Sequence, residues 1–375
     1  CSARFSDNGG ISSIFSGDAY HGRLFKVKVE EEDAMLQVTD LHAGYSGKNV
    51  LSDITFTLNN DEVITLVGPT GCGKTTVLLA LSGIIPVSKG EIATSSWVTT
   101  VDTQVATEAR GVGMVFQDFA LFPHLTVEEN VGFRVKNRER IDYWLSLLDL
   151  QSLRRQKPAQ LSGGQKQRTA LARTLVHDPL YILLDEPLSN LDTSLKDSVR
   201  WQIREALRSS HVPAIWVTHD RAEAMSVGDR VGVMMDGKLV QLDQPESVFR
   251  RPNSPEIAEF LGEAVFLRAS IAGQFAKTIL GDVGIHKGNY SFDDSEVVVL
   301  MRPWDFSVNL ASDGNGIVDW VRFEGETNLV SITLDSKEKI LVRKKSHEQI
   351  PLGKTVKVTI SSNGVHTIFP NRVAN

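Results

Sequence analysis

A glycine-rich segment, Gly68–Thr75, constrains the fold more than any other feature of this sequence. The apolar run Val63–Val67 precedes it and predicts a buried strand, and the pattern after it predicts a helix through about Leu81 that Gly83 ends. A strand, a glycine loop and a helix in this order cradle phosphate, because glycines let backbone N–H groups approach the oxygens closely. The helix also directs the positive end of its dipole to the same place.

The segment fits the phosphate-loop pattern at every required position. We expect Lys74 to contact the terminal phosphates of a nucleotide and Thr75 to place its hydroxyl on Mg²⁺. The alternative is a glycine-rich turn that merely joins a strand to a helix, and the predicted flanking elements argue against it. The residues expected to contact the nucleotide are Gly68, Pro69, Thr70, Gly71, Cys72, Gly73, Lys74, Thr75 and Thr76.

An acidic pair follows a second apolar run. Tyr181–Leu184 predicts a buried strand, and Asp185 and Glu186 come directly after it. Because the carboxyl ends of parallel strands form the ligand edge of a sheet, we expect Asp185 to hold Mg²⁺ and Glu186 to polarise the attacking water. The alternative is a surface Asp-Glu pair at a strand end.

Two further polar residues follow strand-like runs. His219 comes after Ala214–Thr218, where an imidazole is placed to reach a γ-phosphate, although a lone histidine is more often structural than catalytic. Gln117 follows Gly113–Phe116, and its amide is a candidate ligand for Mg²⁺ or water. A single glutamine carries little signal by itself.

From Met35 to about Gly262, predicted strands alternate with amphipathic helices, which indicates a mostly parallel sheet covered on both faces. Asp236-Gly237 lies between Val231–Met235 and Lys238–Leu242 and predicts a two-residue hairpin. One helix is expected to present a single apolar face, formed by Leu195, Val199, Ile203 and Leu207.

The sequence pattern changes after about Gly262. Short strand-like runs separated by turn signals such as Asn363-Gly364 predict a small all-β domain of barrel type over residues 263–375. The expected strands are Val265–Ala272, Val297–Met301, Gly316–Phe323, Leu329–Leu334, Ile340–Val342 and Val356–Ile360.

Bulk properties narrow the class of protein. A length of 375 residues suits two or three domains, and a formal net charge of -6 argues against nucleic acid as the main partner. No stretch approaches the roughly 18 apolar residues that span a bilayer, so a membrane role requires a partner. The cysteines Cys1 and Cys72 form no disulfide framework, which is typical of a cytosolic protein.

Residues 1–34 are polar and rich in glycine and serine, and they include the acidic run Glu30–Asp33. This composition predicts a disordered extension, whose purpose the sequence does not reveal. Cys1 has two interpretations, the lipidated start of a mature lipoprotein or a fragment boundary. The first would place the chain outside the cytoplasm, where there is no ATP.

The segment Leu161–Gln165 resembles the signature motif of ABC ATPases, and it lies between the phosphate loop and the acidic strand end as in that family. The resemblance covers about residues 36–262 and, more weakly, the β region, with no departure at a catalytic position. The other family elements also have counterparts: Tyr45 resembles the aromatic residue that stacks on adenine, Gly68–Thr75 the Walker A loop, Gln117 the Q-loop glutamine, Asp185 and Glu186 the Walker B aspartate and catalytic glutamate, Ser189–Asp192 the D-loop, and His219 the switch histidine.

This resemblance implies an α/β P-loop NTPase fold of ABC type, a mostly parallel sheet with a helical subdomain, followed by a small all-β OB-like domain. We expect the nucleotide-binding domain to span residues 35–262, with its helical subdomain at about 118–175. The β domain is expected to span residues 263–375. It implies ATP and Mg²⁺ as cofactors and a head-to-tail homodimer that sandwiches the ATP. The residues expected to contact the partner's ATP are Ser162, Gly163, Gly164 and Gln165, and those of the D-loop are Ser189 and Asp192.

The C-terminal strands resemble the β-barrel (TOBE-like) appendage of importer ATPases that serve sugars, polyamines, sulfate and ferric iron. A single appendage of this length is most similar to the ferric-iron branch. The resemblance implies two separate transmembrane permease subunits, an indirect solute-binding protein, and a peripheral position on the cytoplasmic face of the cell membrane. Phe119–Val127 resembles the segment that meets a permease, and core of the helical subdomain is the alternative for its aromatic residues.

Two other functions predict different features. A non-transport ABC ATPase that acts on nucleic acid or ribosomes would carry a coiled-coil insertion or two tandem cassettes and basic surfaces, and the sequence shows none of these. A regulatory module that nucleotide merely switches would lack the catalytic carboxylate, whereas Glu186 is present. The transported substrate is not specified by this chain.

Overall fold

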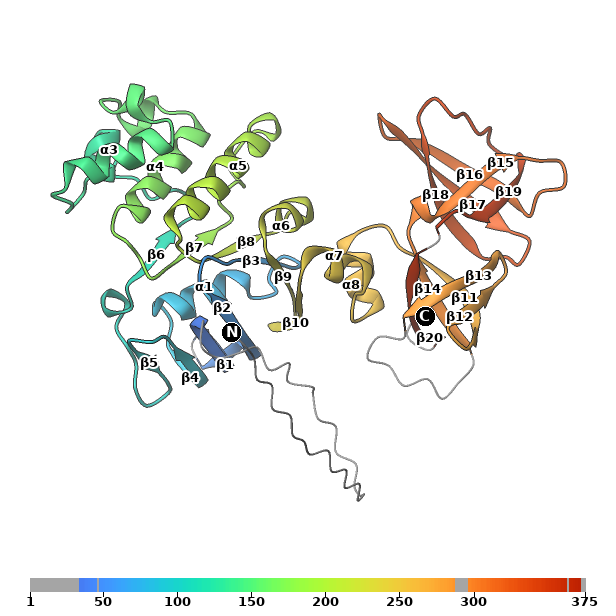
Figure 1. Cartoon of the computed structure of the whole chain (residues 1–375), viewed down its shortest axis with the longest axis horizontal. Helices are drawn as coiled ribbons and strands as arrows, with labels where there is room; N and C mark the ends of the chain where they lie inside the picture. The colour runs from blue at the N-terminus through green and yellow to red at the C-terminus, as the bar shows by residue number, and fades with distance from the viewer. Residues whose placement is uncertain (1–33, 46, 287–295, 363, 372–375) are drawn as a thin grey trace, which may run out of the picture. The chain divides into compact units, whose positions relative to one another are not determined.

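The structure is a computed structural model, and it describes residues 34–45, 47–286, 296–362 and 364–371 (Figure 1). The extension expected over residues 1–34 lies outside the described residues except for its last position. No helix among the described residues is both long enough and apolar enough to cross a membrane.

A six-stranded sheet forms the centre of the nucleotide-binding region, with the strand order β10-β9-β3-β8-β7-β6. All its neighbouring pairs are parallel except β9 and β10, which form the predicted hairpin. All residues of β3, β7 and β8 are buried, as expected of parallel strands covered on both faces. The strands are β3 (Val63–Val67), β6 (Val112–Val115), β7 (Tyr181–Asp185), β8 (Ala214–Thr218), β9 (Arg230–Met235) and β10 (Lys238–Asp243).

The two faces of this sheet belong to different cores. Ile182 and Leu184 of β7 pack in a cluster with apolar residues of the helices α4 (Gly163–Leu175) and α5 (Thr193–Ser210). Tyr181 and Leu183, on the opposite face, pack with α1 (Lys74–Ser82). The parallel sheet with helices on both faces is therefore confirmed.

The predicted apolar face of helix α5 is buried except at its first turn. Val199, Ile203 and Leu207 are buried, but Leu195 is 39% exposed. The prediction concerned only a shared face, and Leu195 is exposed because the helix begins at Thr193 and its contact with the core starts about one turn later, at Val199. Helical periodicity locates an apolar face but does not show how far along the helix the core extends.

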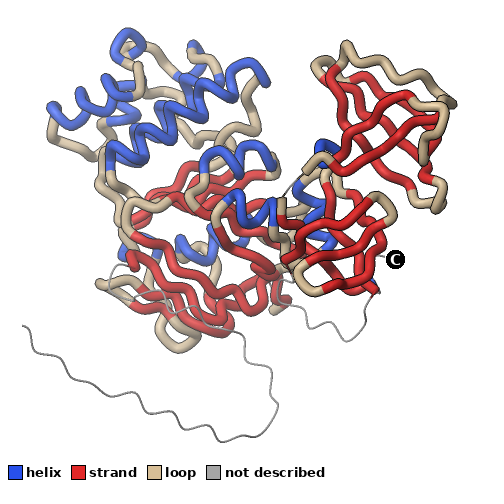
Figure 2. The backbone as a smooth tube through the Cα atoms, turned by 45° about the vertical axis from the view of Figure 1, so that its right-hand side comes forward, coloured by secondary structure: helices blue, strands red, loops and turns tan. Residues whose placement is uncertain are grey.

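Further helices lie between β6 and β7 and after β8, and Figure 2 shows a group of helices at the upper left, above the strands. The helices between β6 and β7 are α2 (Val127–Val131), α3 (Arg138–Leu147) and α4. Those after β8 are α6 (Arg221–Val227), α7 (Pro245–Arg250) and α8 (Pro255–Leu261).

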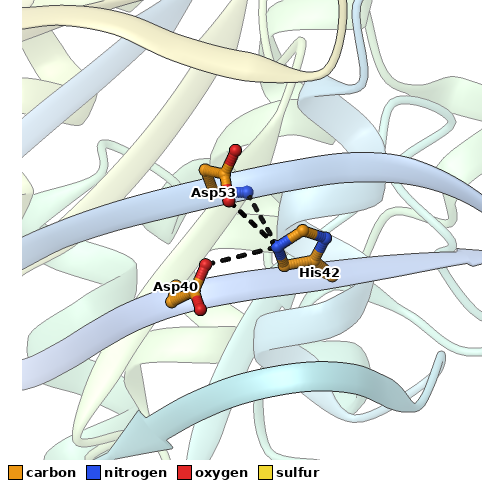
Figure 3. A group of neighbouring side chains, drawn as sticks. All are labelled: Asp40, His42 and Asp53. Carbon is orange, nitrogen blue, oxygen red and sulfur yellow. Dashed lines mark hydrogen bonds and ion pairs between the residues drawn. The ribbon is translucent and has the colours of Figure 1, made fainter.

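An antiparallel sheet of order β2-β1-β4-β5 packs on the other side of α1. His42 of β1 makes a side-chain link to β2, because its Nε2 lies 3.2 Å from Asp40 Oδ1 and 3.1 Å from Asp53 Oδ1 of β2 (Figure 3). Such a trio resembles a metal ligand set, but Lys89 Nζ is 2.9 Å from Asp40 and holds the pKa of that carboxyl below its usual range. The strands are β1 (Ala34–Tyr45), β2 (Lys48–Asn59), β4 (Val87–Ala93) and β5 (Val98–Thr99).

The C-terminal region is all β, as predicted, and contains the expected barrel together with a second sheet. The closed barrel consists of β11 (Val265–Ala272), β12 (Phe275–Thr278), β13 (Gly281–His286), β20 (Val365–Pro370) and β14 (Glu296–Met301). The five-stranded sheet consists of β15 (Phe306–Leu310), β19 (Thr355–Ile360), β16 (Gly316–Phe323), β17 (Thr327–Leu334) and β18 (Lys339–Lys345).

Four of these strands, β12, β13, β15 and β20, were not predicted. In β12 and β13 a single residue each is buried, Ala276 and Val283, so neither strand shows an apolar alternation that a sequence pattern can reveal. The expected all-β domain of barrel type is confirmed, and the five-stranded sheet beside the barrel was not predicted.

One arginine joins the barrel to the helices before it. Arg302 follows β14 and is only 5% exposed. Its Nη1 donates to the carbonyl oxygens of Ala258, Gly262 and Glu263 at 2.9–3.1 Å, and its Nη2 donates to that of Phe249 at 3.1 Å. Burial lowers the pKa of Arg302 to about 10. A buried guanidinium with four carbonyl partners fixes α7 and α8 to the start of the barrel.

Replacing Arg302 by Met leaves these buried carbonyl oxygens without donors, at about 1–3 kcal/mol for each group that water does not reach. We expect Arg302→Met to lower the melting temperature by about 6–10 °C in differential scanning calorimetry. Arg268→Met is the matched control, because Arg268 is an exposed arginine of β11, and its melting temperature should stay within about 1 °C of wild type. Equal effects of the two substitutions would contradict the assigned role.

Candidate active site

The phosphate loop runs from the end of β3 to the start of α1 and is held from outside by the β9–β10 hairpin. A Cβ at position 68 would lie 2.2 Å from Met234 O, so only glycine fits there. Gly71 and Gly73 have φ of 83° and 102°, in the left-handed region that glycine favours. Gly237 N, in the hairpin turn, donates to Cys72 O at 3.1 Å.

Helix α1 is fixed at its other end by a buried cation. Gly83 ends the helix in the left-handed conformation, as predicted. Arg110 is 1% exposed, and its Nη1 donates to Ala80 O at 2.8 Å and Leu81 O at 2.9 Å. Ala80 O also accepts from Gly83 N at 3.1 Å and Leu81 O from the Tyr181 hydroxyl at 3.2 Å, and a cation there complements the helix dipole. Arg110 therefore fixes the C-terminal end of α1, and with it the position of the N-terminal end that faces the phosphate loop.

The side chain of Lys74, the first residue of α1, folds back onto the phosphate loop. Its Nζ donates to Gly68 O at 2.8 Å and to Pro69 O at 3.0 Å, and the side chain is buried. An anionic oxygen is a stronger acceptor than these neutral carbonyls, so a phosphate in the loop would compete for the ammonium. Burial raises the pKa of the nearby Cys72 thiol, which is therefore neutral at pH 7.

Thr75 and Asp185 meet between α1 and β7. Thr75 Oγ1 donates to Asp185 Oδ1 at 3.1 Å. Burial raises the pKa of Asp185, the hydrogen bond from Thr75 opposes this, and the neighbouring Glu186 raises it further. A hydroxyl and a destabilised carboxylate side by side are oxygen ligands of the kind that Mg²⁺ takes, and a divalent cation would relieve the repulsion.

Glu186 and His219 face each other across the ends of β7 and β8. His219 Nδ1 lies 3.0 Å from Glu186 Oε2. The backbone of Glu186 turns sharply out of the strand with φ of 43°, a conformation that stores about 1–3 kcal/mol of strain in a residue other than glycine. It is held by Glu186 N donating to Val217 O at 3.0 Å and by Ser189 Oγ donating to Glu186 O at 2.9 Å.

Gln117 is the second residue after the end of β6, and it is exposed. Asn190 Nδ2 donates to the Gln117 backbone oxygen at 2.8 Å, which ties this residue to the loop that contains Ser189 and Asp192. Asp192 precedes α5 at the N-cap position. Asn190 was not among the predicted site residues, because one amide in a loop gives no signal that would have identified it.

The predicted signature segment forms the start of α4. Ser162 is the N-cap, its Oγ accepts from Gln165 N at 3.4 Å, and Gln165 Oε1 accepts from Ser162 N at 2.8 Å. A Cβ on Gly163 would lie 2.8 Å from Leu191 Cδ2, and one on Gly164 would lie 2.9 Å from Val199 Cγ2. The two glycines thus let this turn pack closely against the loop and helix that follow Glu186.

The structure brings the phosphate loop, Asp185, Glu186 and His219 to one edge of the sheet. Within the described part of the chain, no hydrogen bond joins Ser162–Gln165 to Gly68–Thr76. Tyr45 is 46% exposed at the end of β1. Among the described residues, the signature turn therefore makes no hydrogen bond to the phosphate loop of its own chain.

Asp185 gives a prediction about stability. Its pKa is higher in the folded than in the unfolded chain, so the ionised carboxylate destabilises the fold, and stability falls as the pH rises through that pKa. Asp185→Asn keeps an oxygen for Thr75 and removes the charge. We expect its nucleotide-free, Mg²⁺-free form to melt about 2–4 °C higher at pH 7.5, with a smaller gain at pH 5.

Thermal unfolding followed by fluorescence would measure these differences, with the exposed Asp192→Asn as the control for a lost carboxylate. A destabilised Asp185→Asn at pH 7.5 would show that the burial of charge is not the dominant effect at this position.

Comparisons with known proteins agree with this geometry. The ABC transporter family model matches residues 51–189. The Fe(3+) ions import ATP-binding protein FbpC of Fusobacterium nucleatum is 34% identical over 347 residues, which covers 88% of this chain and 92% of the relative. FbpC 2 of Rhodococcus jostii is 36% identical, with 88% and 98% covered. The spermidine/putrescine import ATP-binding protein PotA of Aliivibrio fischeri is 34% identical, with 88% and 94% covered.

Among solved structures, CbiO1 from Clostridium perfringens, part of the ABC transporter complex CbiONQ, matches with a TM-score of 0.54 and 30% identity. The match covers 59% of this chain and 92% of CbiO1. The predicted family and fold class are thereby confirmed. Because relatives that are more than one-third identical are covered over nearly their whole length, this chain belongs to the ABC transporter family as an ATP-binding subunit that hydrolyses ATP.

Proposed function

We propose that this chain energises an ABC importer, and that the imported solute is ferric iron or another small solute. The relatives whose names describe Fe(3+) or polyamine import are similar to it over the C-terminal β region as well as the ATPase region. The observation that carries the catalytic part is the pairing of Glu186 with His219 at 3.0 Å beside that of Thr75 with Asp185 at 3.1 Å.

In this proposal the loop amides and Lys74 bind the terminal phosphates of ATP. Thr75 and Asp185, joined by Gln117, would hold Mg²⁺, which neutralises phosphate charge when bound. Glu186 accepts the proton of the attacking water, because its carboxylate is partly exposed at the strand end. His219 orients that carboxylate and donates to the γ-phosphate, and the ring of Tyr45 stacks on the adenine.

We assign the signature turn to the ATP of a second copy. Ser162 caps a helix whose first N–H groups and dipole favour an anion, yet its own phosphate loop does not use them. Gly163 and Gly164 pack this turn on Leu191 and Val199, so closure of a homodimer would press on the loop that holds Glu186. Ser189 and Asp192 belong to that loop.

A second surface suits a membrane-embedded partner. Phe122 and Phe133 pack with ring centroids 4.6 Å apart, the guanidinium of Arg173 lies over the ring of Phe122, and all three line a groove of ≈ 450 Å³. Phe119 and Val127, at the ends of the same segment, belong to the core instead. We propose that each copy of this chain takes a short helix of one permease subunit in this groove, on the cytoplasmic face of the membrane. A solute-binding protein would act indirectly, through the two permease subunits.

The catalytic assignment predicts that Glu186→Gln abolishes turnover without loss of ATP binding. The amide cannot accept the proton of the attacking water, so the hydrolysis rate should fall by about 10²–10⁴-fold. ATPase assays and size-exclusion chromatography with Mg-ATP would measure the rate and the trapped dimer. Turnover close to wild type in Glu186→Gln would refute the role given to this carboxylate.

The assignment of the signature turn to the partner's ATP predicts complementation between two inactive variants. Lys74→Ala damages the phosphate loop, and Ser162→Asp repels phosphate while keeping a good helix cap. A homodimer of either variant has two defective sites, whereas a heterodimer has one intact site. Mixing the two should restore up to about one quarter of wild-type turnover, since half of the dimers formed are mixed and each has one of its two sites intact. An inactive mixture of proteins that still exchange subunits would contradict a site shared between copies.

A further inference from the structure

Two buried side chains on either side of His219 are joined to each other. Trp216 lies in β8 and Glu223 in the first turn of α6, and Trp216 Nε1 donates to Glu223 Oε1 at 2.5 Å. Trp216 is 0% and Glu223 is 2% exposed. Their hydrogen bond closes a loop of residues 217–222 that contains His219 near its middle.

Two further hydrogen bonds between residues close in sequence also hold this loop. Asp220 N donates to Thr218 Oγ1 at 3.0 Å, and Glu223 N donates to Asp220 Oδ1 at 3.1 Å. Helix α6 is also fixed to the central sheet, because Thr65 Oγ1 of β3 donates to Ala224 O at 3.1 Å. The carboxyl end of β8 and the amino end of α6 are thus held at a constant separation.

Glu223 is an unusual residue for this position, because burial raises the pKa of its carboxyl and nearby Asp220 raises it further. The hydrogen bond from Trp216 and the charge of Arg200 on α5 oppose the shift. An apolar pair of similar volume would fill the same space without a buried ionisable group. The Trp216–Glu223 pair therefore contributes more to fixing the positions of β8 and α6 than to the stability of the fold.

His219 needs such support. Its side chain is 54% exposed, so packing alone does not fix the ring, yet Nδ1 must lie within hydrogen-bond reach of Glu186. We propose that the Trp216–Glu223 hydrogen bond positions His219 for ATP hydrolysis by fixing the loop that carries it. Trp216 and Glu223 are positioning residues that touch no substrate. This inference rests on the proposed role of His219.

Three substitutions separate the hydrogen bond from simple packing. Glu223→Met removes the acceptor at similar length, Trp216→Phe removes the donor, and Glu223→Gln keeps an acceptor oxygen. We expect the first two to lower kcat about tenfold with KM for ATP within about twofold, because the phosphate loop is untouched. Glu223→Gln should stay within about twofold of wild type. The control for loss of an indole is Trp201→Phe, whose side chain is 57% exposed on α5.

A second measurement tests whether the effect passes through His219. In a His219→Ala background, Glu223→Met should lower kcat no further, because there is no imidazole left to position. An equal fold-loss in both backgrounds would overturn the inference and leave the proposed function intact. If His219→Ala alone leaves kcat unchanged, the proposed role of His219 fails, and the inference fails with it. Should Glu223→Met not fold, Trp216→Phe in both backgrounds provides the same comparison.

Discussion

The hydrogen bond between Thr75 and Asp185 is the contact on which the site depends. It joins the first turn of α1 to the last residue of β7, two strands away from β3 in the sheet. The phosphate-binding and acidic parts of the site meet only because β3, β8 and β7 are parallel and in register, with Val67 opposite Thr218 and Asp185 opposite Val217. The chemistry at the edge is thus a consequence of sheet topology.

The register of these strands is protected by packing on both faces. Alternate residues of β7 and β8 enter two separate cores, so a shift by one residue would exchange every side chain between them. The same shift would turn Asp185 away from Thr75. The apolar residues that form the cores therefore also fix the positions of the polar groups, and the strain at Glu186 is tolerable because both cores hold its strand.

Much of this arrangement could be predicted from the sequence. Val63–Val67 and Ala214–Thr218 were located to the residue, and the polar residues after them met at one edge, since buried strands and glycine loops carry strong local patterns. The exposure of Leu195, the strands β12 and β13, and the bond between Trp216 and Glu223 were not predicted. Each of these features depends on how the end of one helix or strand contacts a neighbouring element. The periodicity of apolar residues in the sequence carries no information about such contacts.

Buried charges mark those unpredicted junctions. Arg110 closes the rear of α1, Arg302 joins α8 to the barrel, and Glu223 joins α6 to β8. Each bonds mainly to backbone carbonyls or to an indole instead of an opposite charge, so each is held by geometry at some expense of desolvation. An apolar contact tolerates sliding, whereas a buried charged group loses its partners when elements move by about an ångström. In the proposed function, such fixed points would help to carry a displacement from the nucleotide to a partner, because packed rigid elements move together.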